Sequence, residues 1–369
     1  MQQLANGTLL QGGKYRIIRF ISSGGFGCTY EAEHILLENR VAIKEFFVKD
    51  FCNRDEDTGH ITVGTNSKRG LVDKMRRKFV DEARALFRLH HDSIVRVTDV
   101  FEENGTAYFV MDYIDGKSLG EVIKKEGALP ESRALKYVRQ VAEALQYVHD
   151  NNRLHLDVKP GNIMIDGNDN ALLIDFGASK QYDEEDGENT STLIGKTPGY
   201  APIEQMGNDV VTFMPATDIY ALGATLYKAI TGATPPSSNM LAAGEELDVI
   251  SANISSSTCD AIVNAMRVRK NDRPQSIADF LSILNKNKCL NDVKLESSNE
   301  EETLCVNVEK EENIIASHSE SKKVSETIKT RSQKETTISE DGNESDIKVV
   351  TLVLFIVFFA LIIKILMEL

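Results

Sequence analysis

The sequence predicts an α+β fold in which a β-rich N-terminal lobe precedes a helical lobe. Two observations support this prediction: strand-like segments dominate the first hundred residues, and amphipathic helical segments dominate from Pro130 onward. Strands followed by helices are typical of an α+β fold rather than of alternating βαβ units. Apolar periodicity with regularly placed Gly and Pro extends over about residues 13–287, which marks the extent of the globular part.

Several segments of the predicted first lobe have the alternating or β-branched pattern of strands. They are YRIIRFIS at 15–22, CTYEAEHI at 28–35 and RVAIKEFFV at 40–48. The stretch 94–114 predicts a β-hairpin, because its central Asn104-Gly105 is a favoured two-residue turn. We expect these segments to form the sheet of the N-terminal lobe.

Two segments show helical spacing of apolar residues. The first covers about 73–90, and its apolar residues and His90 recur three and four positions apart. The second, 130–150, carries a longer apolar face: Leu135, Val138, Val141, Ala142, Leu145 and Val148. Glu82 in the first helix projects from the same face as Phe79 and Leu86, so we expect a buried carboxylate there.

Composition excludes several classes of protein. The formal net charge of -14 provides no basic surplus for nucleic acid, so no nucleic-acid partner is expected. The five cysteines form no CxxC pair, which fits a reducing compartment and predicts neither a disulfide framework nor a zinc site. The N-terminus lacks the basic-then-apolar order of a secretory signal, so we expect most of the chain to stay in the cytoplasm.

The last 80 or so residues differ from the rest. Residues 291–347 contain 15 Asp and Glu against 7 Lys and Arg, which predicts a disordered acidic linker over 288–347. Residues 349–363 carry no charge, and the apolar run resumes after Lys364, so 349–367 is predicted to be a transmembrane helix. We expect a single-pass protein with its globular domain in the cytoplasm, the lipid bilayer as a partner, and no domain beyond the span.

A lysine in the third strand raises two alternatives. Lys44 in RVAIKEF could face solvent from an edge strand, or it could be buried with a carboxylate partner. The inward-facing Glu82 makes the second alternative attractive. The stretch ISSGGFGC at 21–28 could be either a flexible turn or a phosphate-binding loop, and its last glycine, Gly27, lies seventeen residues before Lys44.

Two further motifs decide between these alternatives. HLDVKPGNIMI at 155–165 places Asp157, Lys159 and Asn162 together, and ALLIDFG follows with Asp175-Phe176-Gly177. Together with the Gly-rich loop, Lys44 and Glu82, these motifs resemble protein kinases of the Ser/Thr type. The resemblance covers about residues 14–285, our predicted kinase domain, and is closest to the bacterial, eukaryotic-like (Hanks-type) kinases with a C-terminal membrane anchor. It implies a bilobal kinase fold.

The resemblance implies a role for each motif residue. Asp157 would accept the proton of a Ser or Thr hydroxyl, Lys159 would assist it, and Asn162 and Asp175 would bind Mg²⁺. Lys44 would hold the α- and β-phosphates of ATP and Glu82 would orient Lys44. The residues expected around the nucleotide are Ile21, Ser22, Gly24, Gly25, Phe26, Gly27, Thr29, Ala42, Met111, Asp112, Ile114, Ile163 and Met164.

The C-terminal lobe carries further matches. Thr197 would contact Asp157 and Lys159, and Asp218 would hold the backbone of the catalytic loop. Glu204 and Arg273 would form a buried structural ion pair.

Position 156 departs from the family pattern. Leu156 stands where regulated kinases have an arginine that grips a phosphorylated loop. We therefore expect Thr190, Ser191 and Thr192 in the activation segment to be dispensable for basal activity.

The sequence leaves other functions open. The preferred prediction is a membrane-anchored, ATP- and Mg²⁺-dependent Ser/Thr protein kinase with protein substrates. Self-association of this kinase would allow autophosphorylation. A pseudokinase scaffold at the membrane and a kinase of small molecules or lipids are the alternatives. Residues 50–73, which include HITVG, form an insertion that could bind a partner or be a solvated decoration, and the second is preferred.

Overall fold

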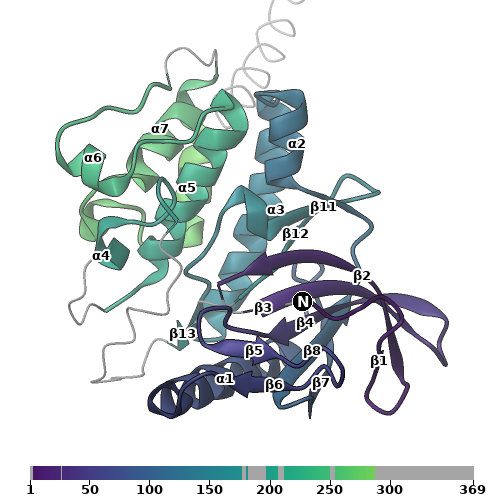
Figure 1. Ribbon diagram of the computed structural model, residues 1–369. Coiled ribbons are helices and arrows are strands. Elements are labelled where there is room, and N and C mark those ends of the chain that lie inside the picture. The colour runs from purple at the N-terminus through teal and green to yellow at the C-terminus, as the bar shows by residue number, and fades with distance from the viewer. Residues whose placement is uncertain are drawn as a thin grey trace, which may run out of the picture. The chain divides into compact units, whose positions relative to one another are not determined.

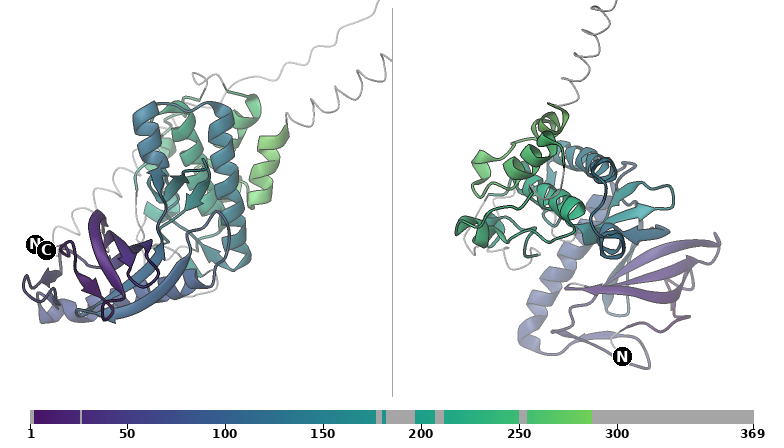
Figure 2. Two further views of the ribbon diagram at one scale, coloured as in Figure 1. Left: turned by 90° about the vertical axis from the view of Figure 1, so that its right-hand side faces the viewer. Right: turned by 90° about the horizontal axis from the view of Figure 1, so that it is seen from above.

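A computed structural model describes residues 3–25, 27–176, 180–181, 197–206, 212–249 and 254–286. These residues form two lobes, one built on strands and the other on helices (Figures 1 and 2). The predicted linker at 288–347 and the predicted membrane helix at 349–367 lie outside this part of the chain. Within it, none of the helices is both long and apolar enough to cross a bilayer.

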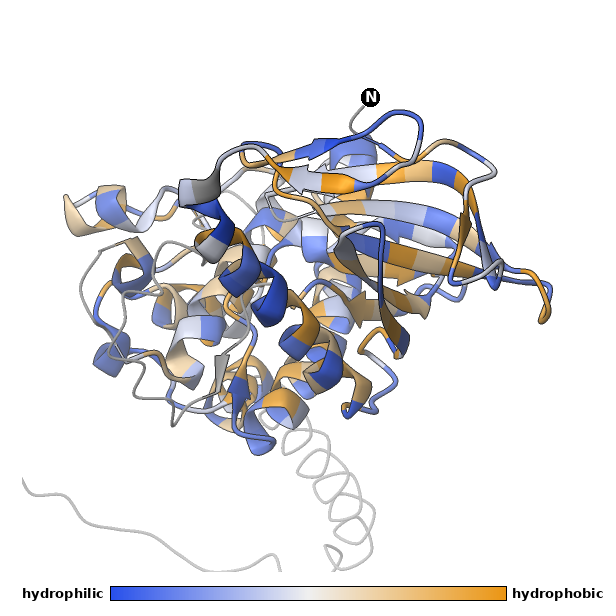
Figure 3. Cartoon of the chain, turned by 60° about the horizontal axis from the view of Figure 1, so that its bottom comes forward, coloured by the Kyte–Doolittle hydropathy of each residue, from blue (hydrophilic) through white to orange (hydrophobic). Residues whose placement is uncertain are grey.

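The first lobe contains a six-stranded antiparallel sheet in the order β1-β2-β3-β4-β8-β7. Its strands are β1 (Leu9–Leu10), β2 (Tyr15–Gly24), β3 (Gly27–His34), β4 (Asn39–Phe46), β7 (Val97–Glu103) and β8 (Thr106–Asp112). Asn104 and Gly105, both with positive φ, make the predicted turn between β7 and β8. Figure 3 shows hydrophobic and hydrophilic residues along these strands. Burial alternates at the start of β2, as burial of one face requires, whereas β8 is buried at five consecutive residues, Thr106 to Val110.

Helix α1 (Asn66–Phe87) packs against β7 and β8. It begins seven residues before the predicted start at 73 and ends three residues before the predicted end at 90, so the predicted bounds were wrong. The first turns are polar and therefore give no apolar signal. At the other end, Arg88 and Leu89 donate to carbonyls three residues back, which closes the helix, and the backbone N–H of His90 donates to Tyr147 instead.

A small hairpin joins β4 to α1. Its strands are β5 (Cys52–Arg54) and β6 (Ile61–Val63), which pair antiparallel. The hairpin expected around HITVG is therefore present, but Cys52 and Ile61 are buried. Most residues of 53–60 are exposed, and the interpretation of this insertion as a solvated decoration stays a prediction.

The helical lobe surrounds one central helix, α5 (Pro215–Thr231), which is buried on nearly all sides. In the part of the chain that the structure describes, the other helices are α2 (Leu119–Glu126), α3 (Glu131–Asp150), α4 (Ile203–Met206), α6 (Ser238–Ala242) and α7 (Ser256–Ala265), with the 3₁₀ turns η1 (Pro160–Asn162) and η4 (Lys270–Asp272) and helical residues at 277–286. Ser118 and Glu121 form a capping box that starts α2. Gly223 allows α5 and α7 to approach closely, because a Cβ there would lie 2.6 Å from the Ala265 Cβ.

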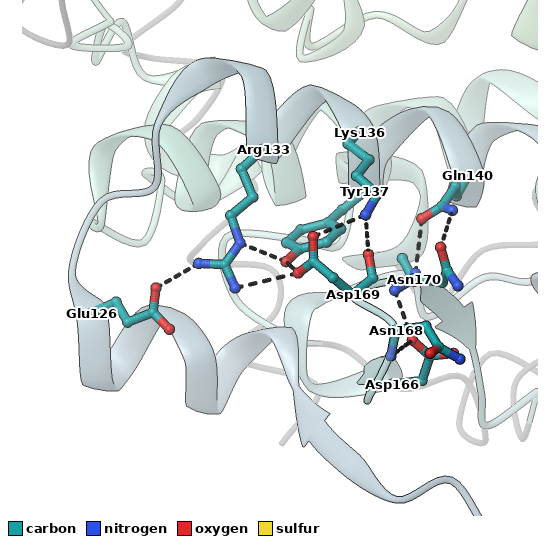
Figure 4. Close-up of polar contacts among 10 residues, drawn as sticks. Glu126, Arg133, Lys136, Tyr137, Gln140, Asp166, Asn168, Asp169 and Asn170 are labelled. Carbon is teal, nitrogen blue, oxygen red and sulfur yellow. Dashed lines mark hydrogen bonds and ion pairs between the residues drawn. The ribbon is translucent and has the colours of Figure 1, made fainter.

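Short strands in the second lobe position its functional loops. They are β9 (Gly116–Ser118), β11 (Ile163–Asp166) and β12 (Ala171–Leu173) in one sheet, and β10 (Arg153–Leu154) with β13 (Lys180–Gln181) in another. Figure 4 shows how the β11–β12 turn is fastened to α3. Asp169 accepts hydrogen bonds from Tyr137 and from Lys136 Nζ at 2.9 Å, and Arg133 lies at ion-pair distance.

Candidate active site

The predicted strand lysine lies where the two lobes meet. The Nζ atom of Lys44 on β4 is 2.5 Å from Oδ1 of Asp175 and 4.0 Å from Oε1 of Glu82 on α1. The partnership with Glu82 is thus present at the limit of ion-pair distance. The closer carboxylate belongs to Asp175, which the sequence analysis placed at the metal site rather than beside Lys44.

Burial sets the protonation of this cluster. Burial tends to lower the pKa of Lys44, but Asp175 and Glu82 outweigh it and hold that pKa above its ordinary value. Burial raises the pKa of Glu82 to about 7, against the opposing effect of Lys44. Within the described residues, Oε1 of Glu82 is buried without a hydrogen-bond partner. Lys44 is therefore charged at neutral pH, whereas Glu82 is near its midpoint.

The catalytic-loop residues form a second cluster in the helical lobe. The Nζ atom of Lys159 lies 2.7 and 2.9 Å from the two oxygens of Asp157, and 3.1 Å from Oγ1 of Thr197. The side-chain amide of Asn162 donates to the backbone oxygen of Asp157 at 2.8 Å and to its Oδ2 at 2.9 Å. Thr197 also donates to Oδ1 of Asp157 at 3.3 Å. The structure thus brings the three other predicted residues around the carboxylate of Asp157.

A buried aspartate holds the backbone of this loop. The carboxylate of Asp218, on α5, accepts the backbone N–H groups of His155 at 2.9 Å and Leu156 at 2.7 Å. Leu156 has a φ of 65°, a strained conformation for a leucine, and Gln205 donates to its carbonyl at 2.8 Å. The predicted hydrogen bonding of Asp218 to the backbone of the catalytic loop is confirmed.

Two histidines take part in this network although no role was predicted for them. His149 Nε2 lies 2.8 Å from Asp218, and the ring of His155 packs 4.4 Å from that of Phe176. Burial lowers the pKa of His155, so its imidazole is neutral at neutral pH. For His155, the sequence contained one sign of a role. It is a polar residue directly after the apolar Leu154 and two positions before Asp157.

Asp175 and Asn162 are linked through the backbone. The N–H of Ile174 donates to the carbonyl of Asn162 at 2.9 Å, which places the residue before Asp175 beside the end of η1. Asp175 has a φ of 59° and a side chain that is 42% exposed. Gly177, the last residue of the motif, lies outside the described residues.

The Gly-rich loop is a tight turn between β2 and β3. Gly24 pairs with Gly27 across it, and Ser22 pairs with Thr29. A Cβ on Gly27 would lie 2.0 Å from the carbonyl oxygen of Glu45, so the close approach of β3 to β4 demands glycine there. Gly24 and Gly25 face open space, and Phe26 lies outside the described residues.

The expected adenine-binding residues lie on β4, β8 and β11. Ala42 pairs directly with Met111 across β4 and β8, while Ile163 is buried and Met164 half-buried. The backbone N–H of Asp112 donates to the carbonyl of Arg96 at 3.0 Å. A base can therefore receive no hydrogen bond from that group, and the donor of the interlobe hinge has to come from a later residue such as Ile114.

A buried ion pair links Arg273 to Glu204 on α4. Arg273, whose side chain is fully buried, contacts Glu204 at 2.6 and 3.0 Å. It also donates to the carbonyls of Arg267 and Val268 at the start of the η4 region. The predicted structural pair is confirmed.

Known proteins share this architecture. A family model described as the protein kinase domain matches residues 15–290. This chain belongs to the protein kinase family. The chain is similar to the serine/threonine-protein kinase PrkC of Bacillus subtilis, with 33% identity over 60% of this chain and 31% of that protein. It is also similar to PknA of Mycobacterium tuberculosis, with 33% identity over 60% of this chain and 48% of that protein.

A solved structure is similar as well. The structure titled "PpkA-294 apo form" matches with a TM-score of 0.66 and 29% identity, over 77% of this chain and all of the other. The predicted kinase family and bilobal fold are confirmed. This chain spans only about a third to a half of the length of the curated kinases named above. Their printed names describe kinases that act on serine and threonine.

Proposed function

We propose that this protein transfers the γ-phosphoryl group of ATP to Ser or Thr hydroxyls of proteins. The observation that carries the proposal is the carboxylate of Asp157, held by Lys159, Asn162 and Thr197. Phosphoryl transfer depends on positioning and on neutralising charge, and such a preorganised set supplies both. The similarity to bacterial Ser/Thr protein kinases supports the same proposal.

Each side chain has a definite task in this reaction. Asp157 accepts the proton of the attacking hydroxyl, and its oxygens are already fixed by neighbouring donors, so little reorganisation is needed. Lys159 places a positive charge beside that carboxylate and beside the transferred phosphoryl group. Lys44 holds the phosphate chain of ATP, for which its Nζ has to turn from Asp175 to a phosphate oxygen. Glu82 limits where Lys44 can move.

Asn162 and Asp175 are the residues that would hold Mg²⁺. When bound, this cation neutralises phosphate charge and orients the phosphoryl group. The two side chains fit such an ion, because the amide nitrogen of Asn162 is engaged by Asp157, which leaves its oxygen for a metal. The partly exposed carboxylate of Asp175 is a second hard oxygen ligand of the kind that Mg²⁺ prefers.

We also propose that residues 349–367 anchor this kinase in a membrane, with residues 288–347 as the tether and the kinase domain in the cytoplasm. An uncharged run of fifteen residues at 349–363 supports the anchor. Tethering would concentrate the kinase near substrates at the membrane and near other copies of itself, which would favour autophosphorylation.

The test of the proposed activity is label transfer from γ-labelled ATP, with Mg²⁺ and casein as a generic protein acceptor. Asp157→Asn should reduce the turnover number by about 10²–10⁴-fold, because the base is lost while the shape is kept. The thermal unfolding of this variant should match the wild type, which shows that the loss is catalytic.

The remaining outcomes discriminate the alternatives. If the wild type binds ATP but transfers no phosphate, the protein is a pseudokinase. If it transfers phosphate to a lipid or a small molecule but never to protein, it is a kinase of small molecules or lipids. Transfer to protein that survives Asp157→Asn would refute the assigned base.

A further inference from the structure

The β5–β6 hairpin is hydrogen-bonded to the six-stranded sheet at the turn between β7 and β8. The backbone N–H of Ile61 donates to the carbonyl of Asn104 at 2.7 Å, in the turn between β7 and β8. Gly105, in the same turn, approaches so closely that a Cβ would lie 2.7 Å from the carbonyl oxygen of Ile61. The hairpin is thus a packed part of the first lobe.

One side chain of the hairpin enters the lobe. The guanidinium of Arg54 lies 2.5 Å from Oε2 of Glu45 on β4, and the two side chains are 3% and 0% exposed. Arg54 also donates to the carbonyl of Gly59 at 3.0 Å, which ties the ion pair to the turn of its own hairpin. A buried ion pair holds its members in one orientation, because each would otherwise be left as an uncompensated charge.

Glu45 has further donors from two other strands. Its Oε2 accepts the hydroxyl of Tyr30 at 2.9 Å, and its Oε1 accepts the hydroxyl of Tyr108 at 2.8 Å. The carboxylate therefore joins β3, β4, β8 and the hairpin at a single buried point. Of these partners, only Arg54 lies outside the six-stranded sheet.

In the sequence, Glu45 and Arg54 lie between Lys44 and Glu82. Glu45 directly follows Lys44, and neighbouring residues of a strand point to opposite faces. On the other side, only Gly64 and Thr65 separate β6 from α1, the helix that carries Glu82. The N–H of Gly64 donates to the carbonyl of Phe51 at 2.9 Å, and Lys68 of α1 lies 5.4 Å from the Phe51 ring.

We propose that Arg54 is a positioning residue, which holds the start of α1 against β4 and thereby sets the separation of Lys44 and Glu82. The inference rests on the proposed kinase activity, because that separation sets how Lys44 is oriented toward the phosphate chain in the transition state. The hairpin serves as a brace between strand and helix. Without it, α1 could move away from β4 while the sheet itself stayed intact.

The test compares Arg54→Met with the double variant Glu45→Gln/Arg54→Met in the full chain. The single variant leaves a buried carboxylate unpaired, so its melting temperature should fall. The double variant removes that charge as well, so its melting temperature should return most of the way to the wild type. Both variants lack the link between hairpin and strand. A matched control is Arg16→Met/Glu33→Gln, which removes a half-exposed ion pair between β2 and β3.

Two measurements then separate positioning from stability. Amide hydrogen exchange over 66–80, the first part of α1, should rise about tenfold in both Arg54 variants and stay within about twofold over β2 and β3. The turnover number should fall about tenfold in both, with the KM for ATP changed less than about threefold, since misplacement of Lys44 affects the transition state more than binding. The control should change neither quantity.

Each other result overturns a specific statement. A double variant with wild-type exchange over α1 refutes the brace, whether or not the protein transfers phosphate. Raised exchange with an unchanged turnover number refutes the positioning role. A wild type that transfers no phosphate refutes the proposed function, and the exchange data still decide whether Arg54 holds α1.

Discussion

Glu82 is a buried carboxyl whose ionisation is costly in the folded state. Its pKa is raised to about 7 by burial, although Lys44 lies 4.0 Å away and opposes this shift. An ordinary glutamate has a pKa near 4.5. Between these two values the folded protein keeps a proton that the unfolded chain has released, so stability falls as the pH rises through this range.

Replacement of Glu82 by glutamine should remove this pH dependence. Between pH 5 and pH 8 the wild type should lose about 3 kcal/mol of unfolding free energy relative to Glu82→Gln, and the loss should level off above pH 7. Urea denaturation of both proteins at several pH values measures the difference. Parallel curves for the two proteins would contradict the raised pKa.

At the scale of elements, the approach of β3 to β4 fixes the Gly-rich loop. The carbonyl oxygen of Glu45 occupies the place of any Cβ on Gly27, whereas Gly24 has open space around it. The two glycines of this loop thus occupy their positions for different physical reasons. Gly27 serves strand packing, and Gly24 leaves room at the turn.

Replacing each of these two glycines by alanine tests the two reasons separately. Gly27→Ala should lower the free energy of unfolding by about 1–3 kcal/mol, because β3 has to move from β4. Gly24→Ala should stay within about 1 kcal/mol of the wild type in the same denaturation experiment. Equal losses in the two variants would show that the loop turn, and not strand approach, sets the cost.

At the same scale, Leu156 of the catalytic loop lies in apolar surroundings. Leu156 is buried in a small cluster with Leu154 and Phe213, where a phosphate-binding arginine would need polar surroundings. No guanidinium at position 156 is available to grip a phosphorylated loop. This arrangement favours activity without loop phosphorylation.

A triple variant tests that independence. Replacement of Thr190, Ser191 and Thr192 by alanine should change the turnover number by less than about threefold. Thr197→Ala is the matched control and should lower it much more, because Thr197 contacts both Asp157 and Lys159. Loss of activity in the triple variant would mean that loop phosphorylation is required.

At the scale of the whole molecule, the proposed anchor and the kinase domain should be separable. A helix of 19 residues spans about 28 Å, close to the hydrocarbon thickness of a bilayer. The full chain should therefore sediment with membranes and resist carbonate extraction, whereas residues 1–347 alone should stay in the supernatant. Both should phosphorylate casein with equal turnover numbers. A full chain that carbonate releases would refute the anchor.

Much of the site was predictable because kinase motifs are local in sequence. Asp157, Lys159 and Asn162 lie within six residues, so the loop that carries them already limits their separation. The β7–β8 turn was equally local, since Asn104-Gly105 favours its own conformation. The bounds of α1 were harder to predict, because its polar first turns are fixed by the preceding hairpin and not by apolar spacing.

The sequence by itself determined the two-lobe order, the family and the motif residues, because each depends on local periodicity or fixed spacing. Only the tertiary structure decided that Lys44 lies closer to Asp175 than to Glu82, and that Glu45 is buried against Arg54. Glu45 stands between Ile43 and Phe47 on one face of its strand, which was a visible sign of burial. Its partner depends on how a hairpin nine residues later folds back and packs, and no local pattern specifies such a contact.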